Sequence, residues 1–465
     1  MEENKKLGVF ALAAIVISAM IGGGIFSLPQ NMAQSASAGA VALAWLITGI
    51  GIFFLANTFR ILAGACPEET TGIYAYARLA FGRFAGFQMA WSYWLSNVFG
   101  NVAYAVLLMD ALDYFFPGVF TGGNNFASII GGSLVIWIMN FAVLRGVRQA
   151  AFMNLVGTIC KLVPIVLFIV IMIAVFKFGI FLKGSSHVSG SLLEQIKSTM
   201  PVTLWAFIGI EGAVVISARA KSQKAVGAAT IMGFLGCLFI YIMLSLLPFG
   251  RMTQPEIAAL ANPSTAPVLS DVVGHWGGVV MNLGVIISLL TSWLAFTIMV
   301  AQIPYAAAKD GTFPAVFSRA NQNDSPSVSL WVTSAVMQMA MIFVYFENNA
   351  WNTMLSVTAV MILPPYLAST ACLWKIAASK GCSRFAKFCG FAGTLYGLWM
   401  IYAAGVQFML MAFVFLAVGI PFFIRARKDA GDEMIMTGRE RFAAALIVAV
   451  AILAVILFSA GIVKL

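Results

Sequence analysis

The sequence predicts an all-α polytopic membrane protein, arranged as a five-plus-five inverted repeat with broken first and sixth helices. Of its 465 residues, 61% are hydrophobic and only 9% are charged, whereas soluble domains carry roughly 25% charged residues. Apolar runs of bilayer-spanning length also follow one another along the whole chain. Glycines interrupt two of these runs, at 22–24 and 209–212. Breaks at corresponding positions of two halves are typical of secondary transporters with a ligand site near the bilayer midplane.

The apolar runs predict about 12–13 transmembrane helices within a single membrane domain covering 1–465. We expect a first repeat at about 8–178, a second at about 199–374 and additional helices over 385–463. The segment 67–78 between the second and third runs is typical of a short amphipathic or re-entrant helix. The runs lie at 8–33, 41–64, 85–110, 126–145, 150–178, 199–218, 226–250, 273–304, 328–346, 350–374, 385–404, 406–424 and 442–463.

The placement of Lys and Arg predicts the orientation. The net charge is +10, but the basic residues lie in short loops between apolar runs rather than in a nucleic-acid-binding patch. With a cytoplasmic N-terminus, nearly all of them fall on the cytoplasmic side, as the positive-inside rule requires. Lys161 falls within a span, and those left outside are Lys177, Lys183, Lys197, Arg251 and Lys464.

Cysteine and histidine usage argues against a metal centre, a cofactor or a disulfide framework. The six cysteines are scattered without a CxxC pair, and the chain has only His187 and His275. Zinc sites need clustered Cys or His ligands. No nucleophile motif or pair of carboxylates in one span suggests an enzyme.

The first broken span is the strongest candidate for a ligand site. An unwound stretch at Gly22–Gly24, preceded by Met20, would present N–H groups at the positive end of a half-helix, which suits a carboxylate. Alternatively, the three glycines only allow close helix packing.

The sixth span carries Trp205, Ile208 and Glu211 around its break. Unwound carbonyls there suit an ammonium group, and tryptophan is the best cation–π partner for an ammonium or guanidinium. An intramembrane carboxylate is by default a functional group. Glu211 could bind a cation directly, act as a protonatable hinge, or be a structural hydrogen-bonded residue.

Two further spans carry polar side chains. Tyr93, Asn97, Asn101 and Tyr104 form one stripe on the third span, which indicates either a cavity or a polar helix contact. Lys161 on the fifth span could hold a fixed charge where a sodium ion would otherwise sit, or could extend to the membrane edge.

Several of these motifs together resemble the amino acid–polyamine–organocation superfamily, and within it the basic amino acid/polyamine antiporter branch of arginine/ornithine and arginine/agmatine antiporters. The resemblance covers nearly the whole chain. It is carried by the segments Met20–Pro29, Gly72–Arg78, Leu204–Gly212, Glu211–Lys221, Ala308–Pro314 and Ala350–Ser356.

The resemblance implies a LeuT-type fold and assigns roles to individual residues. Met20, Gly23 and Gly24 would bind the substrate carboxylate, and Trp205 would pack on the side chain of the substrate. Tyr93, Asn101 and Glu211 would serve as gating positions, and Lys161 would match the lysine of sodium-independent relatives.

One position departs from the family pattern. Counting back from Lys309-Asp-Gly311, the eighth-span tryptophan of the family is Phe296 here, with Trp293 one turn earlier. Phenylalanine is a weaker cation–π face than tryptophan, although Trp293 could partly substitute for it.

These observations lead to a functional hypothesis. External arginine would be exchanged for an internal product across a bacterial inner membrane, with Tyr93 closing the outer side. Ornithine is slightly favoured over agmatine, because agmatine lacks a carboxylate and would leave the first-span amides unpaired. The alternative is a proton-coupled importer of basic amino acids. The resemblance also allows a homodimer, although no dimer motif is readable.

Overall fold

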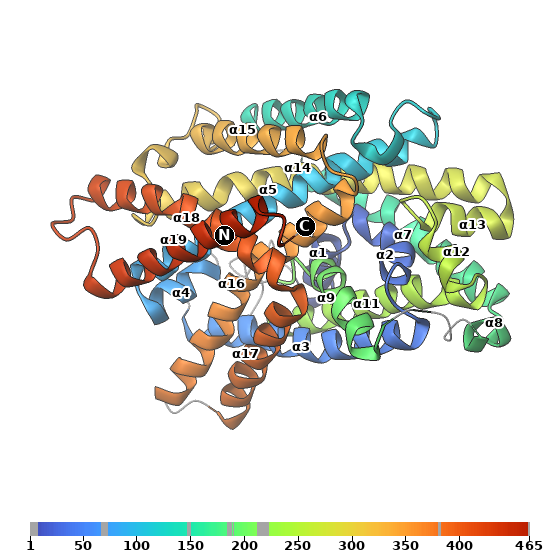
Figure 1. Cartoon of the computed structure of the whole chain (residues 1–465), viewed down its shortest axis with the longest axis horizontal. Helices are drawn as coiled ribbons and strands as arrows, with labels where there is room; N and C mark the ends of the chain where they lie inside the picture. Colours follow the sequence, from blue (N-terminus) through green and yellow to red (C-terminus); the bar gives the residue numbers. More distant parts are fainter. Residues whose placement is uncertain are drawn as a thin grey trace.

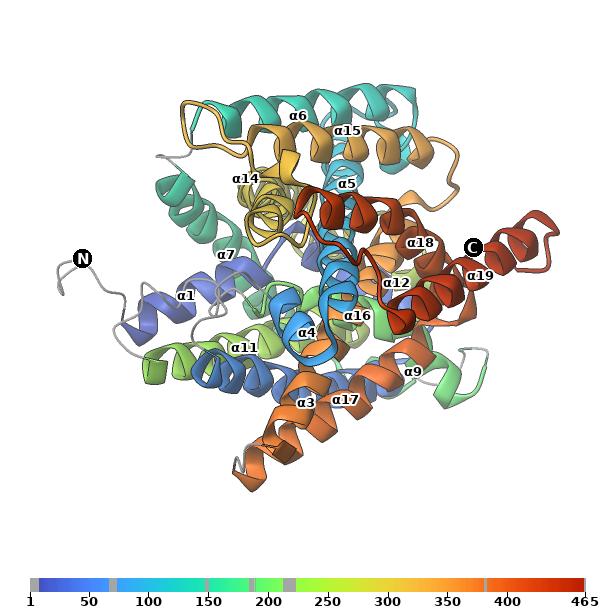
Figure 2. The ribbon, with the colours of Figure 1, turned by 90° about the vertical axis from the view of Figure 1, so that its left-hand side faces the viewer.

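The computed structural model describes residues 8–66, 73–146, 150–183, 188, 190–211, 223–379 and 383–463. The long helices pack together at varied angles (Figures 1 and 2), and within these ranges there are helices, turns, bends and irregular segments but no strands. Ten of the described helices are long and apolar enough to cross a membrane. The prediction of an all-α polytopic fold is therefore confirmed.

The helices correspond closely to the predicted runs. The first half contains α1 (Val9–Met20), η2 (Gly23–Ser27), α2 (Leu28–Ala33), α3 (Ala38–Ala65), α4 (Ile73–Phe81), α5 (Arg83–Asp113), η3 (Thr121–Gly123), α6 (Phe126–Leu144), α7 (Ala150–Val175) and α8 (Phe178–Lys183). The second half contains α9 (Leu192–Ala206), α11 (Gln223–Leu246), η5 (Leu247–Gly250), α12 (Gln254–Ala258), α13 (Thr265–Val273), α14 (His275–Lys309), η6 (Ala315–Ser318), α15 (Ser327–Val344) and α16 (Ala350–Ser379). The chain closes with α17 (Arg384–Ala404), α18 (Val406–Asp429) and α19 (Gly438–Ser459).

The first span is broken where the glycines predict. Helix α1 ends at Met20, Gly22 is extended (φ −86°, ψ −175°), and the chain continues as the 3-10 helix η2 before α2. The three pieces together replace one continuous membrane helix, so backbone groups are freed in the middle of the span.

The sixth span is interrupted as well. Helix α9 ends at Ala206, and Phe207–Glu211 form a turn in which Gly209 has φ +103°, a conformation that favours glycine. Residues 212–222, which include part of this predicted span, lie outside the described residues. The helix begins at Leu192 rather than 199 because Ser191 and Glu194 form a capping box, so helix geometry extends into a polar segment.

Helix α5 is the centre of the bundle, with 83% of its membrane window buried. It packs against α14, α16, α6 and α18 and lies between them in both ribbon views (Figures 1 and 2). The short helix α4, predicted within 67–78, packs against the start of α5 and against α16. Residues 67–72 of that prediction lie outside the described part.

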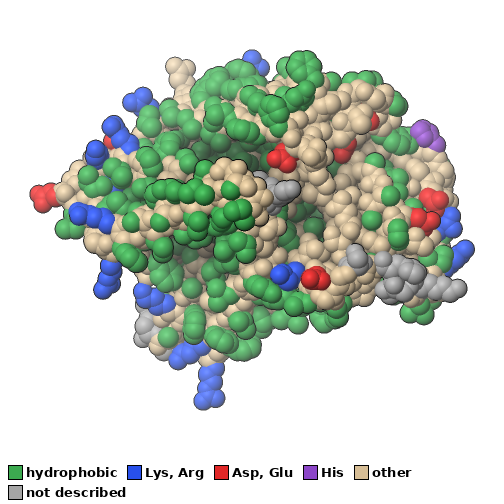
Figure 3. Space-filling view, viewed as in Figure 1, with side chains coloured by type: hydrophobic (Ala, Val, Ile, Leu, Met, Phe, Trp, Pro, Cys, Tyr) green, Lys and Arg blue, Asp and Glu red, His purple; other side chains and the backbone are tan. Residues whose placement is uncertain are grey.

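One end of the molecule is strongly basic. Figure 3 shows Lys and Arg side chains gathered at the end that carries α4 and the connection between α18 and α19. We call this the basic end. There Asp310, just after α14, accepts a hydrogen bond from the Tyr74 hydroxyl (3.1 Å) and pairs with Arg78 (2.8 Å). These contacts attach α4 to the end of α14.

Candidate substrate site

A small cavity of about 30 Å³ lies where the two broken spans meet the centre of α5. This volume holds about two water molecules, so the conformation is closed around the site. The lining combines Met20 and Gly22 from the first span, four positions of α5, three around the break after α9, and one each from α14 and α16: Ser96, Asn97, Gly100, Tyr104, Trp205, Ala206, Ile208, Phe296 and Thr358.

Two amides on α5 carry polar atoms without partners in this part of the protein. Asn97 donates from Nδ2 to the Tyr93 carbonyl (2.7 Å), but its Oδ1 has no hydrogen-bond partner among the described residues. Asn101 is 1% exposed, and both of its side-chain polar atoms lack a partner there. Buried amide groups are normally hydrogen-bonded. Asn97 therefore offers the cavity a free acceptor, whereas Asn101 is buried behind the lining.

The three glycines of the first span allow close packing as well as unwinding. A Cβ on Gly22 would clash with the Tyr104 hydroxyl, and one on Gly24 would clash with the Trp205 ring. A Cβ on Gly23 would clash with the Leu289 side chain. Only Gly22 of the three lines the cavity. In this conformation the Trp205 ring and Leu289 cover Gly24 and Gly23.

A hydrogen-bonded layer of three side chains lies beside the cavity. Glu211 is 1% exposed, and its two carboxylate oxygens accept from the hydroxyls of Tyr93 on α5 and Tyr366 on α16, each at 2.8 Å. Oε2 also accepts from the Gly209 N–H at 3.2 Å. One carboxylate thus joins α5, α16 and the break after α9. We call Tyr93, Glu211 and Tyr366 the carboxylate layer.

The carboxylate layer lies between the cavity and the basic end. Helix α5 starts at that end, and Tyr93 precedes the cavity residues Asn97 and Tyr104 along it. Helix α16 runs the opposite way, and there Tyr366 follows the cavity residue Thr358. If the basic end faces the cytoplasm, as the positive charge predicts, Tyr93 lies on the cytoplasmic side of the cavity and not on the outer side that it was expected to close. The side on which Tyr93 acts therefore stays a prediction that depends on this orientation.

Aromatic rings close the other side of the cavity. Trp205 meets Trp351, at the start of α16, with ring centroids 5.5 Å apart and planes at 85°. The Trp351 indole N–H donates to Asn31 Oδ1 on α2 (3.2 Å). Trp205, 8% exposed, thus separates the cavity from the end opposite α4.

The eighth span contributes Phe296 rather than Trp293. Phe296 lines the cavity and meets Tyr104 edge-to-face at 5.8 Å. Trp293 is 0% exposed, does not line the cavity, and its indole N–H has no partner among the described residues. The departure from the family pattern therefore falls on the cavity wall itself.

Lys161 is 1% exposed and does not line the cavity. Its side chain therefore does not extend to the membrane edge, which excludes that alternative. The burial is compatible with a fixed charge between helices, and that role stays a prediction.

Sequence reasoning missed several positions of the site. Tyr366 lies 155 positions from its partner Glu211, directly after two prolines inside α16, and no local pattern distinguishes it. The Tyr241 hydroxyl on α11 donates to the carbonyl of Met20 (2.9 Å). Met20 is the last residue of α1, so this bond fixes the start of the break. The other missed positions are lining residues: Ser96, Gly100, Ala206 and Thr358.

An acidic vestibule of about 890 Å³ opens at the end of the molecule opposite the basic end. Asp110 and Asp113 of α5 line it together with Asp271 of α13. Asp271 pairs with Arg251 (2.8 Å), and Asp113 accepts from the Phe120 N–H (2.7 Å). The mouth of the protein on this side therefore favours cations.

Comparison with known proteins agrees with this architecture. The amino acid permease family model matches residues 7–452. The chain belongs to the amino acid permease family. It is 54% identical to an arginine/agmatine antiporter of Chlamydia caviae, over 98% of both chains. A relative from Chlamydia pneumoniae with the same name is 52% identical over 100% of this chain and 99% of its own. A Clostridium perfringens protein named as an amino-acid transporter is 53% identical over 98% of this chain and 99% of its own.

The family confirms two expectations. Resemblance to the basic amino acid/polyamine antiporter branch agrees with the names and the full-length similarity of these relatives. The protein is a membrane transporter rather than an enzyme.

Proposed function

We propose that this protein is an antiporter that takes up arginine in exchange for agmatine across a bacterial inner membrane. The observation that carries the proposal is the closed cavity at the two helix breaks. It offers the aromatic faces of Trp205 and Phe296 beside the free Asn97 oxygen. An aromatic wall with an acceptor suits a guanidinium group, which is planar and carries only donors. The names of the relatives support the same substrates.

Alternating access follows from the two closures. Substrate entering through the acidic vestibule would displace the Trp205–Trp351 contact, and release on the other side would require the carboxylate layer to separate. A cavity of about 30 Å³ must enlarge before it holds arginine. The glycine-broken first span and the turn at Gly209 are the segments that can absorb this movement.

Agmatine is the exchange product that we propose first. The preference for ornithine rested on first-span amides that agmatine would leave unpaired. In this conformation Gly23 and Gly24 are covered by Leu289 and Trp205, so that argument has less weight. Ornithine exchange stays a prediction that the same experiment tests.

The topology belongs to the proposal as well. The gathering of Lys and Arg around α4 supports a cytoplasmic basic end (Figure 3), and the cytoplasmic N-terminus predicted from the sequence belongs to the same orientation. The carboxylate layer then faces the cytoplasm and the vestibule faces outward.

The test is uptake of labelled arginine into proteoliposomes preloaded with agmatine, ornithine, arginine, lysine or nothing. Exchange predicts uptake that needs an internal partner, fastest with agmatine. Fastest uptake with ornithine would replace the proposed product but keep the exchange. Uptake into empty vesicles driven by a pH gradient alone would establish a proton-coupled importer and refute the antiporter.

A further inference from the structure

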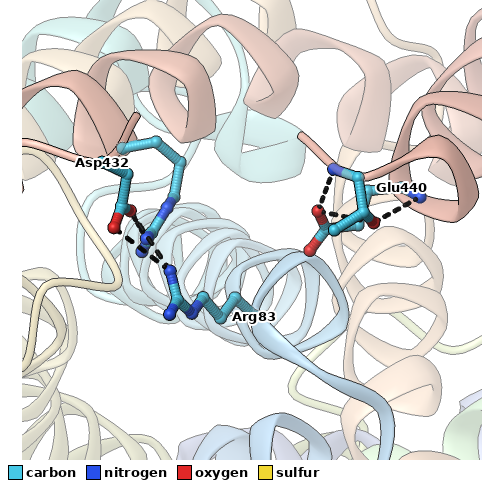
Figure 4. A network of polar contacts seen from close by, with 5 residues as sticks. Arg83, Asp432 and Glu440 are labelled. Atoms are coloured by element: carbon cyan, nitrogen blue, oxygen red, sulfur yellow. Dashed lines mark hydrogen bonds and ion pairs between the residues drawn. The ribbon is translucent and has the colours of Figure 1, made fainter. Parts of the chain in front are cut away.

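A polar pocket of about 790 Å³ lies at the basic end, away from the substrate path. It is formed where the start of α5, the end of α18 and the start of α19 come together (Figure 4). Three arginines from these elements line it: Arg83, Arg427 and Arg439.

The charges of this pocket are only partly balanced. Asp432 pairs with Arg83 (3.2 Å) and with Arg427. The Glu440 carboxylate accepts from the Thr437 N–H (2.8 Å) and hydroxyl (3.0 Å), so it caps α19. Figure 4 shows the Arg83–Asp432 contact and the Glu440 cap as two separate groups of contacts. Arg439 is exposed and has no acidic partner among the described residues. The three guanidinium groups outnumber the two carboxylates, so the pocket favours an anion.

An apolar cavity of about 460 Å³ begins at the same place. Phe81, the last residue of α4, lines both the polar pocket and this cavity. The remaining lining comes from α5, α16, α17 and α18, and it contains only Ala, Val, Leu, Ile, Met, Phe and Pro side chains. Helix α17 packs mainly on α16 rather than on α18, and this leaves the cavity between them.

The dimensions of the cavity suit an extended hydrocarbon chain. Its lining on α16 runs from Val360 to Ala371. At about 1.5 Å per residue, this stretch is about 16 Å long. One leaflet of the roughly 30 Å hydrocarbon core has a similar thickness. The site thus combines a charged pocket at one end with a purely apolar cavity of leaflet length. These two features match the headgroup and the hydrocarbon chain of an amphiphile.

We propose that this site binds one anionic glycerophospholipid from the leaflet at the basic end. Its phosphate would lie against Arg439 and Arg83, and one acyl chain would lie in the apolar cavity beyond Phe81. Basic pockets between transmembrane helices are suited to anionic headgroups. The binding does not depend on the proposed substrates.

The location joins the lipid site to the carboxylate layer. Leu363, Pro364 and Leu367 form part of the cavity wall, and Tyr366 lies between them in sequence. Pro365 has no N–H to donate to the carbonyl four residues earlier. The Ser92 hydroxyl donates to that Met361 carbonyl instead (2.6 Å). An acyl chain in the cavity would therefore pack against the proline-containing part of α16.

Native mass spectrometry of the purified full chain tests the headgroup. The detergent-solubilised protein is titrated with phosphatidylglycerol or with phosphatidylcholine of the same acyl chains. We expect one phosphatidylglycerol to be retained preferentially. Arg439→Gln should weaken its retention about fivefold, the effect of ~1 kcal/mol per basic residue near an anionic lipid. The matched control is Arg319→Gln, which changes another exposed arginine and should retain the lipid normally.

A second variant tests whether the apolar cavity holds the acyl chain. Ala368→Phe fills the cavity, while Ala142→Phe places the same ring on the exposed face of α6. We expect only Ala368→Phe to reduce retention of phosphatidylglycerol, with unchanged elution of both variants on size exclusion. Equal retention of both lipids, or retention unaffected by both Arg439→Gln and Ala368→Phe, would overturn the proposal. A dimer that Ala368→Phe dissociates would instead assign the apolar cavity to a second copy of the chain and overturn it too.

Discussion

The hydroxyl of Tyr366 donates to Glu211 Oε2 at 2.8 Å, and this bond joins α16 to the break that follows α9. Tyr93 donates to the other oxygen of the same carboxylate at the same distance. The two hydroxyls therefore hold one buried acid from two helices that run in opposite directions. Glu211 lies on the unwound part of the sixth span. Any movement of that span must therefore either break these two hydrogen bonds or move the two tyrosines together with the carboxylate.

Tyr366→Phe should speed exchange without weakening substrate binding. The change removes one hydroxyl from the carboxylate layer and leaves the ring packed edge-to-face on Phe59 at 5.7 Å. Hydrogen bonds to charged groups contribute about 1.5–3 kcal/mol. Because release requires the carboxylate layer to separate, loss of one of its bonds lowers this barrier, and we expect a turnover number about tenfold higher. Since Tyr366 does not line the cavity, KM for arginine should change little. The kinetics are measured in proteoliposomes, with Tyr402→Phe on the exposed face of α17 as the control. A raised KM with normal turnover would place Tyr366 in the binding site instead.

Trp205→Leu should abolish arginine exchange while leaving membrane insertion intact. The indole ring lines the cavity and packs over Gly24 and against Trp351. Leucine offers neither a cation–π face nor a ring large enough to close that side. Exchange is measured in proteoliposomes after confirming a monodisperse size-exclusion profile. The comparison variant is Trp374→Leu, which changes an exposed tryptophan on α16. Retained exchange in Trp205→Leu would remove this residue from the substrate site.

The membrane spans can be predicted from the sequence more completely than the residues of the site. Hydropathy predicts the position of each membrane span, because each span must by itself be apolar enough to lie in lipid. The helix break is also a local property, because the glycines at 22–24 weaken the helix at that point. Those features, together with Trp205 and Asn97 as lining residues, are readable along the chain. Tyr366 and Thr358 reach the site only through the packing of α16 against α5, which no local pattern encodes. The side of the cavity on which Tyr93 lies likewise depends on its order relative to Asn97 along a packed helix.

Glu256→Gln should destabilise the protein at neutral pH but not in acid. Glu256 accepts from the Thr253 N–H (2.7 Å) and hydroxyl (2.8 Å), and these bonds lower the pKa of the Glu256 carboxyl below its ordinary 4.5. A pKa depressed on folding stabilises the folded state above the unfolded-state value, and this contribution is lost as the pH falls through the folded-state value. The capping box holds α12, whose Gln254 donates to the Ala33 carbonyl at the end of α2 (2.5 Å).

Thermal melts of the detergent-solubilised protein check this. The melting temperature of Glu256→Gln should be lower than that of the unmodified protein at pH 7, because the amide can keep the cap but loses the charge at the helix N-terminus, a contribution of about 0.3–1 kcal/mol. The difference should shrink as the pH falls below 4.5. A constant difference at every pH would mean that the variant acts through packing rather than through the charge.

Phe296→Trp should tighten arginine binding selectively. Phe296 lines the cavity and is only partly buried, so a larger ring can extend into the site when the cavity opens. Tryptophan presents a stronger cation–π face than phenylalanine, and a gain of about 0.5–1 kcal/mol corresponds to a KM about two- to fivefold lower. Competition by unlabelled arginine and by leucine against labelled arginine uptake measures the effect. Only arginine should compete better, because leucine carries no side-chain charge. An equal gain for leucine would mean that the ring adds apolar contact alone, and the aromatic wall would then play no part in selecting a guanidinium.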